Sequence, residues 1–159
     1  MAKPEERGGM VMPRGLVVFA TRTNQTERIA RLIAEGMRFE GHDVDVLNVT
    51  EINKGGISLD DYNAIVLGSA TYHGEMLQSM KTFLFFAEKA NLEGKAGGAF
   101  GAFGWSGEAP GRIFDTMTHI MKMDMVREPL RLKSADLGGG IKMAQDYGRE
   151  VAGKALAST

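Results

Sequence analysis

Hydroxyl and amide side chains are concentrated in one short segment, TRTNQT, which follows the first apolar run of the chain. The segment consists of Thr21, Arg22, Thr23, Asn24, Gln25 and Thr26. A helix cap needs only one such residue, whereas three threonines spaced T-x-T-x-x-T can surround a phosphate with hydroxyl donors. Neither G-x-G-x-x-G nor G-x-x-x-x-G-K-[ST] is present, which excludes the dinucleotide fingerprint and the nucleoside-triphosphate loop. The spacing therefore predicts a phosphate site of another kind.

The elements on either side of this segment would position it. Residues 16–20 (LVVFA) are an apolar run of strand length, and from Thr26 to Met37 apolar residues recur with the period of a helix. The hydroxyl groups would therefore lie between the carboxyl end of a strand and the amino end of a helix. Free backbone N–H groups and the positive end of the helix dipole favour an anion there.

Two later loops follow apolar runs in the same way. The run 62–68 leads into a loop that carries Tyr72, and the run 95–103 leads into a loop that carries Trp105. The carboxyl ends of parallel strands share one edge of a sheet, so both rings would lie near the phosphate site. Flat aromatic side chains can stack on a planar ring. A phosphate at one end and a stacked ring at the other describe a mononucleotide of the flavin type.

Strand and helix patterns alternate along the chain, which predicts an α/β fold with helices on both faces of a parallel sheet. We expect a three-layer αβα arrangement with five parallel strands, the last of which, Met125–Leu132, is interrupted by Pro129. The helix expected after residue 75 also carries Phe85 and Phe86, which predicts heavy burial. The helix that starts near Pro110 has an apolar stripe formed by Ile113, Met117, Ile120 and Met121.

Length and composition indicate a single domain. We expect this domain over residues 15–159, and a disordered N-terminal extension or cloning remnant over residues 1–14.

A net charge of −1 and a pI of about 6.3 suggest neither nucleic acid nor a membrane surface as a partner. The lack of cysteine excludes disulfides, iron–sulfur clusters and thiolate metal sites, and the three histidines are too scattered for a metal site. Without a signal-peptide or transmembrane pattern, a cytoplasmic location is expected.

As a set, the three loops resemble those of the flavodoxin family, and more narrowly the flavodoxin module of the A-type flavoproteins (flavodiiron proteins). TRTNQT is similar to the family's T/S-x-T-G-x-T loop, SATYHGE to the loop after its third strand, and FGWSGEA to the flavodiiron-type loop after its fourth strand. The resemblance implies the strand order 2-1-3-4-5 and an FMN cofactor whose phosphate binds at residues 21–26. It implies contacts to the flavin ring from Ala70, Thr71, Tyr72, His73, Gly74, Phe103, Gly104, Trp105 and Gly107.

The resemblance also implies a function, low-potential electron transfer between a reductase donor and an acceptor protein. An electron carrier, as a monomer or weak dimer without catalytic or metal-binding residues, is favoured over a self-standing enzyme. In such proteins the peptide between His73 and Gly74 is the candidate to turn its carbonyl toward the flavin N5. Asn24 stands where the family usually has Gly, and Tyr72 where it typically has Trp. Because these 159 residues include no counterpart of the family's diiron domain, we do not expect the oxygen- or nitric-oxide-reducing chemistry of full flavodiiron proteins here.

Other functions on the same fold remain open. An FMN-dependent NAD(P)H:quinone-type oxidoreductase is the main alternative, although no residues for a nicotinamide or quinone pocket stand out. A docking module that has lost FMN is a further possibility. A phosphoacceptor receiver domain would need an Asp at the end of the third strand, where Gly68 and Ser69 stand. Glu75 is expected to be a solvated charge or a charge at the amino end of the next helix.

Overall fold

The computed structural model describes residues 6–7, 10–21, 24–52, 57–72, 74–102, 107–136 and 138–157. Its central sheet contains the strands β3 (Arg14–Ala20), β4 (Asp43–Asn48), β5 (Ala64–Ser69), β8 (Ala96–Ala102) and β10 (Leu130–Leu132). The strands run in the order β10-β8-β5-β3-β4, and every neighbouring pair is parallel. Numbered along the chain, these long strands have the order 2-1-3-4-5, which confirms the expected topology.

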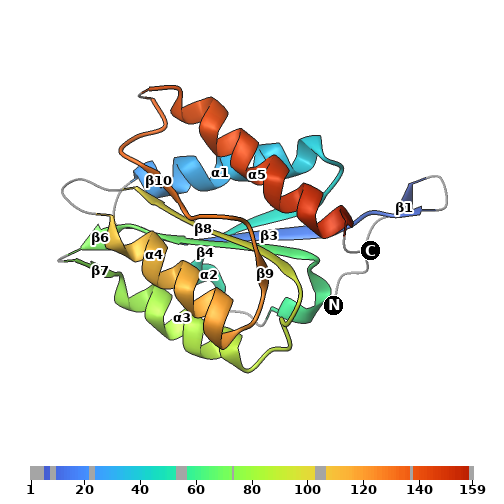
Figure 1. Cartoon of the computed structure of the whole chain (residues 1–159), viewed down its shortest axis with the longest axis horizontal. Helices are drawn as coiled ribbons and strands as arrows, with labels where there is room; N and C mark the ends of the chain where they lie inside the picture. Colours follow the sequence, from blue (N-terminus) through green and yellow to red (C-terminus); the bar gives the residue numbers. More distant parts are fainter. Residues whose placement is uncertain are drawn as a thin grey trace.

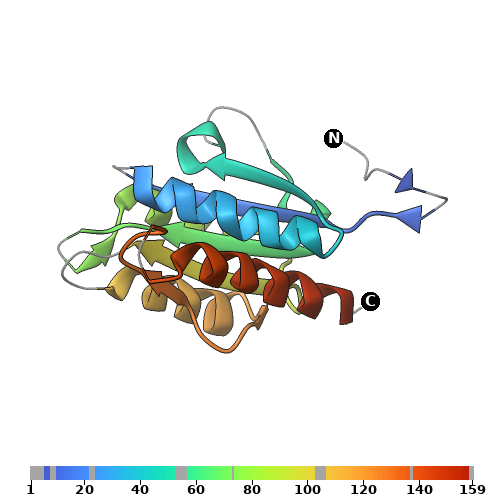
Figure 2. The ribbon, with the colours of Figure 1, turned by 90° about the horizontal axis from the view of Figure 1, so that it is seen from above.

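Helices cover both faces of this sheet, so the predicted three layers are confirmed (Figure 1). On one face α1 (Asn24–Phe39) packs beside α5 (Gly140–Ala157), as Figure 2 shows from above. On the other face lie α2 (Val49–Ile52), α3 (Gln78–Glu88) and α4 (Glu108–Asp115), which a π-helical turn, η2 (Thr116–Ile120), continues. The remaining elements are short: β1 (Glu6–Arg7), β2 (Met10–Val11), η1 (Leu59–Asp61), β6 (Thr71–Tyr72), β7 (Glu75–Met76) and β9 (Asp124–Met125).

The helices α1 and α5 approach one another closely because glycines occupy their crossing. A Cβ atom added at Gly148 would lie 1.9 Å from the carbonyl oxygen of Ile33, and one added at Gly36 would lie 1.9 Å from that of Gln145. No side chain larger than hydrogen fits at these positions without moving a helix. The pair therefore forms a tightly packed cover over this face of the sheet, and α1 begins at the edge where the predicted site lies.

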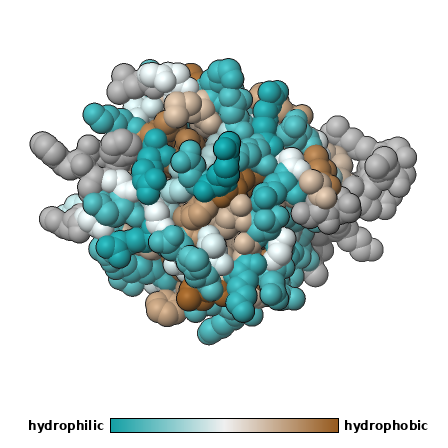
Figure 3. All heavy atoms as spheres, viewed as in Figure 1, coloured by the Kyte–Doolittle hydropathy of each residue, from teal (hydrophilic) through white to brown (hydrophobic). Residues whose placement is uncertain are grey.

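The fifth strand is broken, as Pro129 predicts, and a tyrosine fills the gap. Both β9 and β10 pair with β8, at residues 96–97 and 100–102 respectively. Between them, the N–H of Ala99 donates to the Tyr147 hydroxyl at 3.1 Å. The hydroxyl oxygen lies 3.0 Å from the carbonyl oxygen of Ala99 and 2.9 Å from that of Glu128, and it can donate to either. Short pieces and a proline are typical of a protected sheet edge. Figure 3 shows the molecule from the side of this edge. Hydrophobic residues gather near the middle of the view, and hydrophilic residues surround them.

Three expectations about apolar side chains are wrong. Phe85 and Phe86 are 69% and 44% exposed, because α3 packs on the sheet through Met80, Phe83, Leu84 and Ala87. Residues two apart on a helix point in nearly opposite directions, so burial of Phe83 turns Phe85 outward. Ile120 is 60% exposed, whereas Met121 is buried. The π turn, in which the N–H of Met121 bonds to the carbonyl of Thr116 at 3.1 Å, shifts the helical register there.

The first strand of the central sheet, β3, begins at Arg14, one residue before the expected domain. Its guanidinium is nearly buried, lies 3.1 Å from the carboxylate of Asp45 and stacks over the ring of Tyr62. β1 and β2 pair as a short antiparallel hairpin before it. The expected disorder of residues 1–14 stays a prediction. Within the described residues, no helix has both the length and the apolar character needed to cross a membrane.

Candidate cofactor site

The carboxyl ends of β3, β5 and β8 meet at one edge of the sheet, at the left of Figure 1. The N–H of Ala70, just after β5, donates to the carbonyl of Ala20 at the end of β3 (3.2 Å). The N–H of Ala109, in the first turn of α4, donates to the Thr71 hydroxyl (3.1 Å). The first bond joins the ends of β3 and β5, and the second joins the segment after β5 to α4, the helix that follows β8. With the parallel pairing of β5 and β8, the predicted convergence is confirmed for the described residues.

The first loop ends in a buried hydroxyl group. Of the six residues expected to hold a phosphate, Thr21, Asn24, Gln25 and Thr26 are described, and Arg22 and Thr23 lie outside the described residues. Thr26 lies in the first turn of α1 and is fully buried, yet its Oγ1 has no hydrogen-bond partner among the described residues, and neither has Oε1 of Gln25. A buried polar group without a partner is costly. The donor hydroxyl and the helix terminus fit an anionic group such as a phosphate.

The second loop is a small β-hairpin, which the sequence did not reveal. β6 pairs with β7 so that Tyr72 lies opposite Glu75, and the turn between them contains Gly74 at φ +75°. Tyr72 is 51% exposed. A two-residue connection with glycine second is a recognised hairpin signal, but strands of two residues leave no alternating pattern. His73, the other turn residue, lies outside the described residues.

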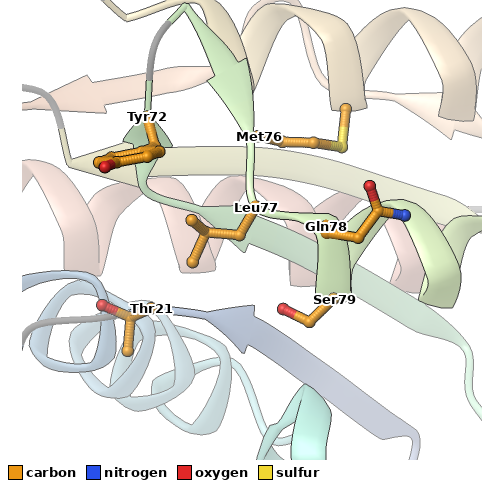
Figure 4. Close-up of a pocket in the computed structure, with 6 residues that line it drawn as sticks. All are labelled: Thr21, Tyr72, Met76, Leu77, Gln78 and Ser79. Atoms are coloured by element: carbon orange, nitrogen blue, oxygen red, sulfur yellow. The ribbon is translucent and has the colours of Figure 1, made fainter.

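Beside this hairpin lies a cleft of about 390 Å³ (Figure 4). Its lining consists of Thr21, Tyr72, Met76, Leu77, Gln78 and Ser79. In Figure 4 the side chain of Leu77 points into the space between Tyr72, Thr21 and Ser79. The structure thus brings together Thr21 and Tyr72, which were predicted site residues, with residues 76–79, which sequence reasoning missed. Their position directly after the predicted loop was the available signal.

The third loop is described only at its end. Phe103, Gly104 and Trp105 lie outside the described residues, and Gly107 precedes α4. The carbonyl of Gly107 accepts a hydrogen bond at 3.0 Å from Nε of Arg131, in β10. Arg131 therefore holds this loop from the neighbouring strand. It was not predicted, because nothing in the local sequence connects it with a loop that precedes α4, η2 and β9.

Charged side chains join the hairpin to the helices α3 and α4. The carboxylate of Glu75 lies 2.5 Å from Nζ of Lys81 in α3 and 3.0 Å from Nε of Arg112 in α4. The hydrogen bond from Lys81, with the nearby charge of Arg112, holds the pKa of Glu75 below its ordinary value. Glu75 is therefore paired rather than simply solvated, and it lies just before the amino end of α3, the other place expected for it. The described residues contain no group of three or more acidic or histidine side chains placed to hold a metal ion.

A model of the flavodoxin domain matches residues 16–137, from β3 to the residues just before α5. The chain belongs to the flavodoxin family. The match includes all three loops, and it confirms the family that the loop motifs resemble.

Individual relatives agree with this assignment. A rubredoxin-oxygen oxidoreductase from Megalodesulfovibrio gigas is 30% identical over 89% of this chain, but the chain spans only 37% of that relative's length. A flavodoxin from Clostridium saccharobutylicum is 30% identical over 69% of each protein. An NAD(P)H dehydrogenase (quinone) from Rhodopseudomonas palustris is also 30% identical, over 72% of this chain and 69% of that protein.

A solved structure matches most of the chain. A flavodoxin from the domain Archaea superposes with a TM-score of 0.81 at 29% identity, covering 90% of this chain and 99% of that one. A domain of this size and topology is therefore also found as a separate flavodoxin.

Proposed function

We propose that this flavodoxin-family domain binds FMN and transfers electrons between redox proteins. The buried Thr26 hydroxyl carries the proposal, since it lies without a described partner where a strand end meets the first turn of α1. The phosphate-binding residues are then Thr21, Arg22, Thr23, Asn24, Gln25 and Thr26. A phosphate accepts hydrogen bonds, and so it satisfies a group that the described part of the protein leaves unpaired.

The flavin ring is proposed to lie between the second and third loops. Tyr72 offers an exposed aromatic face, and Gly74 allows backbone close to the ring edge. The ring-contacting set is Ala70, Thr71, Tyr72, His73, Gly74, Phe103, Gly104, Trp105 and Gly107. Bound FMN supplies the one-electron and two-electron redox chemistry. The chain itself binds, orients and partly shields the ring.

The partners are proposed to be a reductase that donates electrons and a protein that accepts them. We place the protein in the cytoplasm as a monomer or weak dimer. The near-neutral net charge of −1 argues against a strongly acidic docking face. The second candidate is an FMN-dependent NAD(P)H:quinone-type oxidoreductase, because one relative is an NAD(P)H dehydrogenase (quinone).

One experiment separates these functions. The purified protein is titrated with FMN and then reduced stepwise without oxygen. A carrier should quench FMN fluorescence, turn yellow, and accept electrons in two separate one-electron stages. It should not oxidise NADH or NADPH when a quinone is added. Reduction in a single two-electron stage, with consumption of NADH or NADPH by the quinone, would favour the oxidoreductase. A protein that FMN cannot turn yellow contradicts both.

A further inference from the structure

Two side chains of β7 fix the β6–β7 hairpin: Met76, which is buried in the core, and Glu75. The two carboxylate oxygens of Glu75 reach different helices: Oε2 lies 2.5 Å from Nζ of Lys81 in α3, and Oε1 lies 3.0 Å from Nε of Arg112 in α4. Glu75 is also the residue paired directly with Tyr72 across the hairpin. Any movement of Glu75 is therefore passed to Tyr72 through the backbone pairing.

Hydrogen bonds hold the base of the hairpin. At its base, the Thr71 hydroxyl accepts a hydrogen bond from the N–H of Ala109, and the N–H of Leu77 donates to the Ser69 hydroxyl at 3.0 Å. At its tip, a Cβ atom added to Gly74 would find no described atom within 4 Å. Two-stranded ribbons are marginally stable by themselves. Glu75, which is paired with Tyr72 beside the turn, joins this end of the hairpin to α3 and α4 through its ion pairs.

We propose that Glu75 is a positioning residue, which holds Tyr72 and the turn at Gly74 against α3 and α4 in the place where the flavin ring is to bind. The inference rests on the proposed function, because it takes the hairpin to border the ring. Glu75 itself need not touch the cofactor. Both ion pairs are partly solvated, with side-chain exposures of 36% for Lys81, 41% for Glu75 and 57% for Arg112. Such pairs add little to global stability, so their loss should loosen the hairpin without unfolding the domain.

Charge removal and loss of positioning predict different results for Glu75→Gln. The substitution removes a negative charge, which by electrostatics alone should tighten the binding of an anionic cofactor and raise its reduction potentials. Loss of positioning should instead weaken FMN binding, roughly three- to tenfold for members of one interacting network. Lys81→Gln breaks the same contact from the other side with the opposite change in charge. Positioning therefore predicts that both variants shift each potential in the same direction.

The test measures the FMN dissociation constant by fluorescence quenching, both midpoint potentials, and the melting temperature of each apoprotein. Asp146→Asn is the matched control, since it removes a carboxylate paired with Lys142 (2.7 Å) on α5. Lys81→Arg keeps the charge and the donor. Both controls should bind FMN as the wild type does, and all melting temperatures should stay within a few degrees.

The possible failures are distinguishable. If the wild type does not bind FMN, the proposed function is wrong and the inference falls with it. If the wild type binds FMN, but Glu75→Gln binds it equally or more tightly and the two charge variants move the potentials in opposite directions, Glu75 acts by its charge alone. That result would overturn the positioning role and leave the proposed function intact.

Discussion

The hydroxyl of Thr26 and the hydroxyl of Thr118 have the same chemistry but different surroundings. Thr26 is fully buried without a described partner, whereas Thr118 donates to the carbonyl of Phe114 at 2.8 Å. Thr26→Val keeps the shape and removes the unpaired group, so the apoprotein should be as stable as the wild type or slightly more stable. A hydrogen bond to a charged group contributes about 1.5–3 kcal/mol. FMN binding should therefore weaken about tenfold to a hundredfold.

Fluorescence titration with FMN and urea unfolding of the apoprotein test this prediction together. Thr118→Val is the control, because it should leave FMN binding unchanged and lower the free energy of unfolding. Unchanged FMN affinity in Thr26→Val would remove Thr26 from the phosphate site.

His42 is a second buried polar residue, at the opposite end of the sheet from the proposed site. Its side chain is buried, with 2% of the residue exposed. Neither ring nitrogen has a hydrogen-bond partner among the described residues. Burial lowers the pKa of His42 below its ordinary value of 6.5. Below about pH 6.5 the unfolded chain therefore binds a proton that the folded protein resists. The free energy of unfolding should fall as the pH is lowered through this range.

Urea unfolding of the apoprotein at pH 7.5 and pH 5.5 measures this effect. His42→Leu should make the stability less dependent on pH across this interval, since it removes the group that titrates. His119 is exposed, and the variant His119→Gln serves as the comparison. Equal pH dependence in His42→Leu and the wild type would assign the effect to other groups.

At the scale of elements, the crossing of α1 and α5 depends on the absence of a side chain at Gly148. A Cβ atom there would lie 1.9 Å from the Ile33 carbonyl oxygen, a backbone atom that cannot turn away. Gly148→Ala should therefore lower the free energy of unfolding by about 1–3 kcal/mol, as overpacking commonly does. Gly153 is in the same helix, and a Cβ atom added there would meet no described atom within 4 Å. Gly153→Ala should stabilise the protein by about 0.5–1 kcal/mol through helix propensity.

Both substitutions are measured by urea unfolding of the apoprotein. Because they make the same chemical change in one helix, opposite signs would identify the close crossing as the cause. A Gly148→Ala protein as stable as the wild type would show that the helices can separate without cost.

The broken fifth strand depends on the hydroxyl of Tyr147. This hydroxyl accepts from the N–H of Ala99 and lies 3.0 Å from the carbonyl of Ala99, at the gap between β9 and β10. Tyr147→Phe should leave both backbone groups unpaired in the interior, at a cost of about 1–3 kcal/mol in the free energy of unfolding. Urea unfolding gives this cost, and hydrogen exchange should be accelerated at the Ala99 amide. Unchanged exchange at Ala99 would show that the hydroxyl does not protect the gap.

At the scale of the whole molecule, local patterns predicted the layers and the site edge. The apolar runs 16–20 and 62–68 each end abruptly in polar residues, which locates strand ends without knowledge of the tertiary structure. The strand order came from the resemblance of the loops to a known family, because period and composition do not specify which strands are neighbours. The exposure of Phe85 follows from the helical period once Phe83 lies on the buried stripe, so the sequence contained the signal for it. The ion pairs of Glu75 were not predictable, since they depend on how α3 and α4 pack beside the hairpin.

Cofactor binding should stabilise the whole domain. The residues of the proposed site follow β3, β5 and β8 or lie in the first turn of α1, so the site exists only when these elements are folded together. A ligand that binds only the folded state adds about 2.7 kcal/mol at a concentration one hundred times its dissociation constant. For a domain of this size that corresponds to an increase in the melting temperature of about 5–10 °C. Removal of FMN by dialysis should reverse the increase.

Riboflavin distinguishes the contribution of the phosphate from that of the ring. It carries the same isoalloxazine but lacks the phosphate that the Thr21–Thr26 loop is proposed to bind. At equal concentration it should raise the melting temperature of the wild type less than FMN does. In Thr26→Val the difference between the two ligands should shrink, because the lost hydroxyl served only the phosphate. Equal shifts with riboflavin and FMN in the wild type would mean that the ring loops alone hold the cofactor and that the buried hydroxyl has another partner.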